Sequence, residues 1–517
     1  MRTLCILAVL SMVVPGCGGG GGGGGGGGTS SAPPPGGGST GGGPIAPLAP
    51  VDTSSPDHVI NVNQSAGAIH AALQAAFNAG GIIVFNNASP VTIVLPAEVV
   101  LPDLGSAVLD GGGTVTLSGG SATRILRKNW LSTLTVQRLG FVDARTPDEG
   151  AAIHVTNWDG ALTVIDCDFT NCKTTSTGPD IGGGAIRATG QTWLQVSGCT
   201  FTDCDGSNGG AICTIGCRIT LVDCAFSGCN AFGSGGGADQ GPGGQGGIGG
   251  AVYVDGVHQN NASNPRLDVS GCVFSGNAAG DHAGGLFVYA YAGTGSQILF
   301  DACTFNGNTV TGMAAGVYHQ NGALTLRRSS FIGNTATESA GGIWSIAEGY
   351  ATIENCTFQG NRAEGASPGF GGGLWLSGTF TVNACTIAGN HGAGWGGGLW
   401  TGTASSVTLR NTLLQNNTGT NIWNGWNVNA TCVDGGNNMQ WPTTRSNGSA
   451  DVPATGGVAW ANAQLQPIAD NGGATWTMAL PAGSPAINAG SAATAPLLDQ
   501  RGMSRAGAPD IGAFEAP

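Results

Sequence analysis

The sequence is poor in charge and has almost no lysine. Only 9% of its 517 residues are Asp, Glu, Lys or Arg, the only lysines are Lys128 and Lys173, and the formal net charge is −13. Nucleic-acid binding depends on Lys and Arg side chains that neutralise phosphates. The composition therefore argues against a nucleic-acid partner, and it is a poor match for a strongly anionic polysaccharide.

Helical segments are also scarce. Apolar residues fall at helical spacing in one good stretch, residues 66–77, which Gly80 and Gly81 end. No repeat contains a helical run of useful length, so leucine-rich and helical-hairpin repeats are excluded. The apolar run from Leu4 to Val14 is too short to span a bilayer.

What the chain does contain is a short pattern that recurs about nine times between residues 161 and 417. Each copy begins at a small or sulfur-containing residue, has Phe or another apolar residue two positions later, and has Cys or Asn five positions later. The copies start 25 to 32 residues apart, with one interval of 48. Such a period indicates a solenoid with one copy per turn. The starting residues are Cys167, Cys199, Cys224, Cys272, Cys303, Ser329, Cys356, Cys385 and Asn411.

The local pattern identifies the kind of solenoid. Alternating segments such as Leu324-Thr325-Leu326 indicate strands, and Gly-Asn and Gly-Gly pairs between them indicate turns. We therefore predict an all-β fold, a right-handed single-stranded parallel β-helix of about ten turns. The helix at residues 66–77 would cap its N-terminal end, because an open solenoid end exposes strand edges and core.

Equivalent positions of such a solenoid lie directly above one another. The Phe positions would form an interior stack, and the Asn positions would form a ladder of amide hydrogen bonds. In the first three copies Cys172, Cys204 and Cys229 occupy the ladder position. The predicted ladder consists of Asn277, Asn308, Asn334, Asn361, Asn390 and Asn416.

A second motif, Gly-Gly followed by an apolar and then an aromatic residue, shares the period, as in Gly341-Gly342-Ile343-Trp344. Strand alternation places its third and fourth residues on opposite faces. If the third residue faces the core, the fourth forms an exposed stripe that could stack on sugar rings; otherwise it belongs to the core. Trp395, Trp423 and Trp426 could extend the stripe. The candidate stripe is Phe287, Tyr318, Trp344, Trp375 and Trp400.

This motif, paired with Phe-x-x-Asn as in Phe274 to Asn277, resembles the repeat of polymorphic outer-membrane proteins. The resemblance covers about half of the chain and implies a bacterial surface β-helix of a family that includes adhesins. The chain departs from the family pattern in two ways: Cys replaces Asn in the early turns, and Leu or Ile replaces Ala in the late ones.

The C-terminal part, Asp470-Asn471-Gly472-Gly473 followed by residues 480–490, 499–502 and 510–515, resembles closely that of choice-of-anchor Q proteins. These are exported bacterial β-helix proteins, so the resemblance implies a pectate-lyase-like solenoid with a C-terminal cap at residues 441–517. From the residues themselves we predict a structural role. Ion pairs among four side chains would seal the last turn: Asp499, Arg501, Arg505 and Asp510.

The N-terminus has the features of an export signal. Arg2, the apolar run and Val14-Pro15-Gly16-Cys17 form a signal peptide, residues 1–17, whose end resembles a bacterial lipobox. Cys17 would then be lipidated; the alternative is an ordinary signal peptide with an incidental Cys. Residues 18–50, rich in Gly and Pro, would be a flexible tether to the membrane lipid. Residues 51–150 would form the N-terminal cap and first turns, and residues 151–440 the repeats.

Fifteen cysteines raise the question of disulfides, because export permits them. Without Cys5 and Cys17 an odd number remains. Cys213 with Cys217, and Cys199 with Cys224, are the candidate bridges. No second Cys or His pair lies near Cys213 and Cys217 in the sequence, so we predict no metal site and no cofactor.

The acidic residues of the repeats form no recognisable cluster with Arg or Lys at matching turns, and Asp281-His282 are isolated neighbours on a turn. A lyase would need a base, commonly with calcium carboxylates, and a hydrolase would need paired acids. We therefore name no catalytic residues and expect an exported, lipid-anchored protein of the outer membrane or cell surface. It would bind a glycan or a host or neighbouring cell. The alternatives are a carbohydrate-active enzyme, either a polysaccharide lyase or a glycoside hydrolase, and a structural envelope protein.

Overall fold

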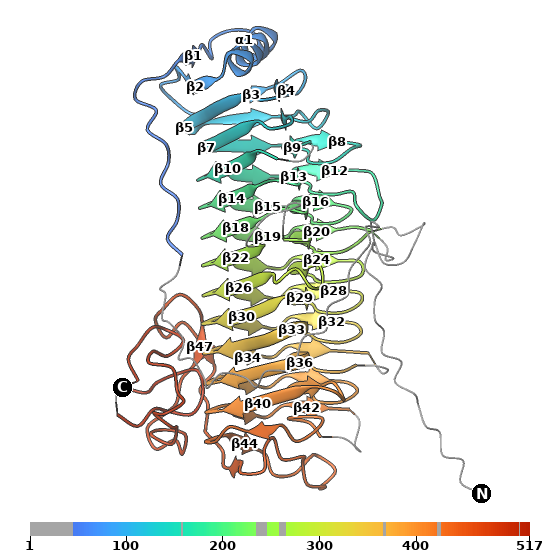
Figure 1. Ribbon diagram of the computed structural model, residues 1–517, viewed down its shortest axis with the longest axis vertical. Helices are drawn as coiled ribbons and strands as arrows, with labels where there is room; N and C mark the ends of the chain where they lie inside the picture. Colours follow the sequence, from blue (N-terminus) through green and yellow to red (C-terminus); the bar gives the residue numbers. More distant parts are fainter. Residues whose placement is uncertain are drawn as a thin grey trace, which may run out of the picture.

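The computed structural model describes residues 45–156, 159–233, 246–257, 265–365, 369–420, 425–505 and 507–517. Within these ranges the chain winds into a right-handed parallel β-solenoid of about 13 turns (Figure 1). The predicted fold class is confirmed. The solenoid is longer than about ten turns because strands before residue 142 and after residue 433 add turns that lack the repeat motif.

The strands stack in four columns, which we call faces 1 to 4 in the order in which each turn visits them. Face 1 consists of β1 (His58–Ile60), β2 (Gly81–Phe85), the first part of β5 (Ser106–Ser118), the first part of β7 (Thr133–Val142), β10 (Ala161–Ile165), β14 (Trp193–Ser197), β18 (Ile219–Val222), β22 (Arg266–Ser270), β26 (Gln297–Asp301), β30 (Ala323–Arg327), the second part of β33 (Ile343–Glu354), the second part of β36 (Leu374–Asn383), β40 (Ser406–Arg410) and β43 (Val433–Asp434).

Face 2 continues each turn after a sharp corner. It consists of β3 (Val91–Val94), the second parts of β5 and β7, β11 (Asp168–Thr170), β15 (Thr200–Thr202), β19 (Ala225–Ser227), β23 (Val273–Ser275), β27 (Thr304–Asn306), β31 (Ser330–Ile332), β34 (Thr357–Gln359), β37 (Thr386–Ala388), β41 (Leu413–Gln415), β44 (Met439–Trp441) and β45 (Ala459–Trp460).

Faces 3 and 4 close each turn. Face 3 is a separate sheet of β8 (Arg145–Thr146), β12 (Lys173–Thr174), β16 (Asp205–Gly206), β20 (Asn230–Ala231), β24 (Ala278–Ala279), β28 (Thr309–Val310), β32 (Thr335–Ala336), β35 (Arg362–Ala363), β38 (His391–Gly392) and β42 (Thr418–Gly419). Face 4 consists of β4 (Val99–Leu101), β6 (Leu126–Lys128), β9 (Ile153–Val155), β13 (Ile186–Thr189), β17 (Ile212–Ile215), β21 (Val252–Asp255), β25 (Leu286–Tyr289), β29 (Val317–Gln320), the first parts of β33 and β36, and β39 (Leu399–Thr401).

The interior Phe stack is present as predicted and begins one turn earlier than the motif, at Phe141. Eight rings from Phe141 to Phe358 lie face to face, with centroids 4.6 to 4.8 Å apart and ring planes within 13° of one another. Ile387 and Leu414 continue the column. Burying each of these side chains contributes about 1.5–3 kcal/mol, so the column is a major source of stability.

The Asn ladder is also present, but its last predicted member is wrong. Each side-chain amide donates to the side-chain oxygen one turn further on, with N–O distances of 2.8 to 3.0 Å. Asn417, not Asn416, follows Asn390. Asn416 occupies the preceding corner, where its φ is 56° and where earlier turns place glycine, as at Gly389. The last repeat copy is therefore shifted by one residue.

The ladder ends on a charge. Asn417 donates to Asn427, and Asn427 donates to the carboxylate of Asp451 at 2.9 Å. All the amide dipoles of the ladder thus point the same way along the solenoid, and a buried carboxylate accepts from the last of them. This arrangement satisfies polar groups that would otherwise be unpaired in the interior.

Helix α1 (Ala66–Ala79) covers the N-terminal end of the solenoid, as predicted (Figure 1). The Ser65 hydroxyl accepts from the backbone N–H of Ala68 and caps the first turn. Ile69, Leu73 and Phe77 are buried on the side that faces the solenoid core. The helix therefore closes the end where the first strands would otherwise be open.

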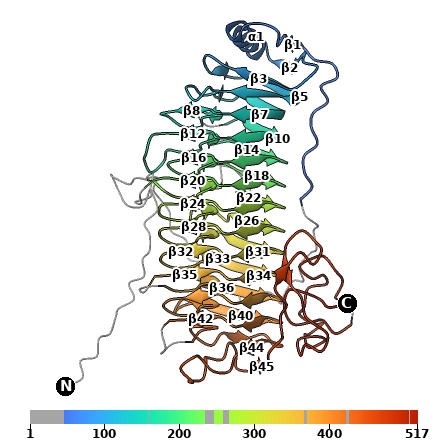
Figure 2. The same ribbon diagram turned by 180° about the vertical axis from the view of Figure 1, so that it is seen from behind.

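The described residues that precede β1 run along the outside of the solenoid, beside the corner between faces 1 and 2 (Figures 1 and 2). The Leu48 N–H donates to the Ser197 hydroxyl, and Val51 exchanges two hydrogen bonds with the Gln137 side chain. The Thr53 hydroxyl donates to Asp110. Residues 45–50, which the sequence assigned to the flexible tether, are thus held against the body. The rest of the tether and Cys17 lie outside the described residues.

The C-terminal segment lies beside the last turns instead of sealing the end, which corrects the prediction (Figures 1 and 2). The outward hydroxyls of face 2 bind it: Ser330 donates to the Trp476 carbonyl, Thr357 donates to Gln500 Oε1, and Thr386 accepts from the Ala513 N–H. The antiparallel pair β46 (Ile468–Ala469) and β47 (Thr477–Met478) belongs to this segment.

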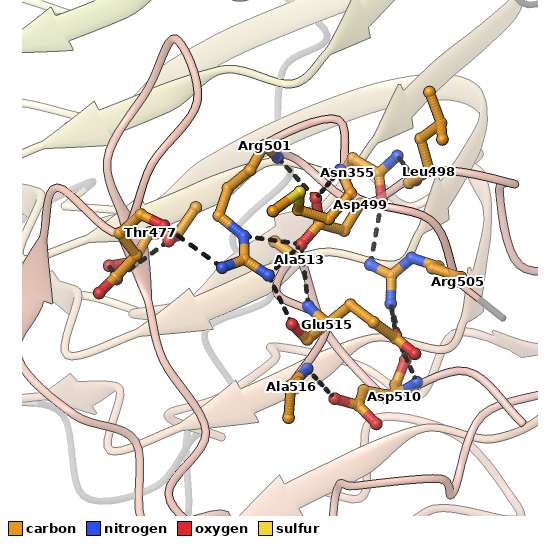
Figure 3. A network of polar contacts seen from close by, with 12 residues as sticks. Asn355, Thr477, Leu498, Asp499, Arg501, Arg505, Asp510, Ala513, Glu515 and Ala516 are labelled. Carbon is orange, nitrogen blue, oxygen red and sulfur yellow. Dashed lines mark hydrogen bonds and ion pairs between the residues drawn. The ribbon is translucent and has the colours of Figure 1, made fainter.

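The four charged residues that were predicted to seal the last turn meet in one network (Figure 3). Arg501 pairs with Asp499 at 2.8 Å. Arg505 pairs with Glu515 at 2.9 Å. Its hydrogen bond to Asp510 goes to the backbone carbonyl and not to the carboxylate. Arg505 also donates to Asn355 Oδ1 at 3.2 Å. Of the four predicted side chains only Arg501 and Asp499 form an ion pair with one another among the described residues, and the network joins the segment to the side of the solenoid.

Candidate functional site

The predicted aromatic stripe forms a continuous column on face 4. Tyr253 precedes the five predicted residues, and all six are paired in register through neighbouring strands. The residue before each of them points inward: Ile343 and Leu374, for example, are fully buried in the main core. The aromatic side chains therefore point outward from the solenoid, because alternate strand residues face opposite sides.

Pointing outward does not expose this column. Phe287, Tyr318, Trp344 and Trp400 are 6%, 2%, 7% and 9% exposed, and only Trp375 is partly exposed. Ala283, Ala314 and Ala340, at the corner that leads into face 4, pack against the rings in a hydrophobic cluster separate from the main core. Neither predicted alternative describes this arrangement. The column is a second, smaller core outside the sheet.

The rings of the column use their faces to contact one another. Centroid distances between neighbours are 4.3 to 5.2 Å, and the ring planes are 11° to 19° apart. A sugar ring binds an aromatic side chain through the face of the ring, and these faces are occupied. Along most of its length the column therefore offers only ring edges to a ligand.

Polar side chains close the N-terminal end of the column. The next positions in register are Cys213 and Arg187, and the Arg187 guanidinium donates to Cys213 Sγ at 2.9 Å. Glu149 lies 3.4 Å from Arg187 and 3.5 Å from His154. Burial raises the pKa of the Cys213 thiol to about 12, so the thiol is neutral and Glu149 balances the Arg187 charge.

The opposite end of the column reaches solvent. Phe370 stacks on Trp400 with 5.4 Å between centroids, and Trp395 lies 5.6 Å from Phe370 at a tilt of 46°. Trp395 is 40% exposed. The Trp400 indole N–H is buried, and no described residue accepts a hydrogen bond from it. We call Phe370, Trp375, Trp395 and Trp400 the aromatic end site.

Sequence reasoning named three members of this site and missed Phe370. Trp395 was expected to extend the stripe, and Trp375 and Trp400 belong to it. Phe370 lies two residues before the Gly372-Gly373 pair of its motif, at the position that is Ser339 in the turn before and Trp395 in the turn after, so the motif gave no reason to select it. Trp426 is placed elsewhere, where its backbone N–H donates to Asp451 Oδ1, and Trp423 lies outside the described residues.

Asp281 Oδ2 lies 2.9 Å from His282 Nδ1. The His282 ring packs edge-on against Tyr318, with centroids 5.2 Å apart. The pair is therefore part of the cover of the aromatic column. Among the described residues no group of three or more His, Cys, Asp or Glu side chains is placed to hold a metal ion.

The predicted disulfide between Cys213 and Cys217 is wrong. Cys213 points outward into the cluster of the aromatic column, whereas Cys217 points into the main core. Two thiols on opposite sides of a sheet cannot form a bridge. Cys199 and Cys224 do stack on adjacent turns, but both are free thiols.

Comparison with known families gives one match, and comparison with curated proteins gives none. The model of the right handed beta helix region matches residues 293–461, which contain the later repeats and the aromatic end site. None of the described helices is long and apolar enough to cross a membrane. The sequence match and the stacked strands together show that this chain is built on a right-handed parallel β-helix.

Proposed function

We propose that this protein is an exported, lipid-anchored β-helix of the bacterial surface that binds glycans and acts in adhesion. The resemblance of its two motif sets to polymorphic outer-membrane protein repeats and to choice-of-anchor Q proteins supports the location. The aromatic end site supports the binding role. The proposal names Trp395 as the principal contact, because its indole is the most exposed ring of that site.

The chemistry of the end site suits a neutral sugar. Trp395 presents a partly free aromatic surface to the apolar face of a pyranose ring. The unpaired Trp400 N–H is a donor for a sugar hydroxyl, and a buried donor gains most from such a partner. Trp400 is held on strand β39, and Trp395 packs against Phe370 in the bend that leads from β38 to β39, so both indoles are placed before a ligand binds.

A glycan array probed with the purified full-length protein tests the binding role. Trp395→Ala should weaken binding about tenfold, because an aromatic contact contributes about 0.5–1.5 kcal/mol beyond its buried area. Trp476→Ala, which removes an indole of similar exposure (49%) from the C-terminal segment, is the control and should change nothing. Equal losses in both variants, or none in Trp395→Ala, would contradict the proposal.

The same experiment separates the two alternatives. Release of shorter fragments from a bound polysaccharide would identify a carbohydrate-active enzyme. A protein that neither binds nor cleaves any glycan would be the structural envelope component.

The anchor is tested separately. Cys17→Ala should move the protein from the membrane fraction to the soluble fraction, and mass spectrometry of the wild-type N-terminal peptide should show an acylated Cys17. A mature chain without acyl groups would refute the anchor and leave the binding role intact.

A further inference from the structure

Face 2 carries a second feature that the aromatic end site does not involve. One outward position of every turn on this face lies in register, and at Gly140 it has no side chain. Gly140 is the only glycine at this position among the described strands. From β3 onward the column reads Thr92, Thr116, Gly140, Asp168, Thr200, Ala225, Val273, Thr304, Ser330, Thr357, Thr386, Leu413, Met439 and Ala459.

The backbone does not require glycine here. Gly140 does not have a positive φ, so an L-amino acid would fit its conformation. An added Cβ would lie 2.7 Å from Thr116 Oγ1, 3.2 Å from its Cγ2 and 3.3 Å from its Cβ, so the Thr116 side chain would have to shift. The glycine accommodates Thr116 and leaves space on the surface beside it.

That space is the floor of an open hollow of about 420 Å³. Thr92, Thr116 and Thr170 contribute hydroxyl groups to its wall, and Arg138, Asp166 and Asp168 contribute charged groups. The sequence gave no sign of this cluster, because Arg138 and the two aspartates come from different turns. Its volume lies in the range of small-molecule sites.

The charges of the hollow are not balanced. Arg138 is committed to the buried Asp110, with Nε 3.0 Å from Oδ1 and Nη2 in contact with Oδ2. Asp166 and Asp168 are exposed, and neither is within ion-pair distance of a described Lys or Arg side chain. Asp168 accepts one hydrogen bond, from the Thr200 hydroxyl. The open wall thus has two carboxylates and several hydroxyls.

We propose that this hollow binds an amino sugar, with the ammonium group at Asp166 and Asp168 and the ring hydroxyls at the threonines. A carboxylate is a strong acceptor for an ammonium group, and Arg138, the cation that also lines the hollow, makes its hydrogen bonds to Asp110 and Thr53. A uronic acid would meet like charges and be rejected. This site is separate from the aromatic end site on face 4 and stands whether or not that site binds glycans.

Calorimetry with the full-length protein tests the proposal, using a β-1,4-linked glucosamine tetramer and its fully N-acetylated counterpart. The glucosamine tetramer should bind at least tenfold more tightly. Gly140→Val fills the floor without touching a charge and should reduce this affinity at least tenfold. Ala225→Val, at an exposed residue three positions further along the same column, is the matched control and should bind as the wild type does.

Two further variants keep the test decisive if Gly140→Val folds poorly. Asp166→Asn and Asp168→Asn change exposed side chains and should each weaken binding of the glucosamine tetramer, whereas Trp395→Ala should not. Equal affinity for the two tetramers would overturn the proposal. Unchanged binding by Gly140→Val would overturn it as well, because it would reveal diffuse attraction to a protein of net charge −13.

Discussion

The effect of a single residue on the stability of this solenoid depends on the column in which the residue lies. Lys128 is one of two lysines in the chain, and its side chain is fully buried on face 4 among inward positions such as Val155 and Ala188. Its ammonium group donates to Gln191 Oε1 at 2.9 Å. Burial lowers the pKa of Lys128 to about 8. A charged ammonium group thus lies in an otherwise apolar column, and the side chain to which it donates, Gln191, is neutral.

Lys128→Met should stabilise the protein at neutral pH. The unfolded chain holds the Lys128 proton up to its ordinary pKa of 10.5, whereas the folded chain releases it near 8. Wild-type stability should therefore rise between about pH 8 and 10.5, by up to about 3 kcal/mol from this group. Urea unfolding at a series of pH values should show this rise in the wild type and not in Lys128→Met. Identical pH profiles would contradict the assignment.

The cysteines also depend on the column in which they lie. Those of the described residues are free thiols, all buried except Cys432, which is partly exposed. Burial raises the pKa of Cys303 and of Cys432 to about 12, so both are protonated and unreactive at neutral pH. Ellman's reagent should react slowly with the native protein and quickly after denaturation. If the unfolded chain, alkylated without prior reduction, carried fewer alkyl groups than it has cysteines, disulfides would be present and this prediction would be wrong.

At the scale of the element, the strands of each turn are stabilised by hydrogen bonds to the turns before and after it. Asn417 accepts from the backbone and side chain of Asn390 and donates to Ile387 O and Asn427. Its neighbour Asn416 is exposed and only forms the corner. Two adjacent residues of the same type therefore have different consequences, which a pair of substitutions can measure.

Asn417→Ala should destabilise the protein by about 2–4 kcal/mol, because it leaves several buried groups without partners. Asn416→Gly should change stability by less than about 0.5 kcal/mol, because glycine occupies the equivalent corner of earlier turns and tolerates a positive φ. Thermal or denaturant unfolding measures both. A large loss in Asn416→Gly with none in Asn417→Ala would restore the register expected from the sequence.

At the scale of the whole molecule, two segments that lack the repeat lie against the outside of the solenoid. Residues 45–56 occupy the corner beside the earlier turns, and the C-terminal segment covers face 2 of the later ones (Figure 2). Between them face 2 keeps outward Thr, Ser and Ala side chains in contact with solvent, and the hollow at Gly140 lies at its N-terminal end.

Arg505→Ala should loosen the C-terminal segment without unfolding the solenoid. Arg505 is buried and satisfies Glu515, Asn355 and the carbonyls of Asp510 and Gly512, and losing one partner of a buried ion pair costs about 3–5 kcal/mol. Limited proteolysis should cut residues 462–517 much faster in this variant. Met503→Ala, an exposed change in the same segment, should be cut at the wild-type rate.

Much of the architecture was predictable because the stacked turns of a solenoid have equivalent positions that recur at a regular spacing in the sequence. Each turn repeats the same side-chain environment. Phe274 and Phe305 therefore predict an interior aromatic column, and Asn308 and Asn334 predict a ladder of side-chain hydrogen bonds. The prediction failed where the period slipped by one residue, at Asn416. It also failed where two close cysteines, Cys213 and Cys217, fall on opposite sides of the sheet.

The sequence by itself determined the coiled parallel sheet, the residues that fill its interior and the helix that closes its first end, because these depend on local periodicity repeated from turn to turn. Only the tertiary structure decided that the outward aromatic column is covered, that the C-terminal segment lies along the side, and that Arg138, Asp166 and Asp168 surround one hollow. Those features arise from contacts between segments that share no repeat, so no spacing in the chain records them.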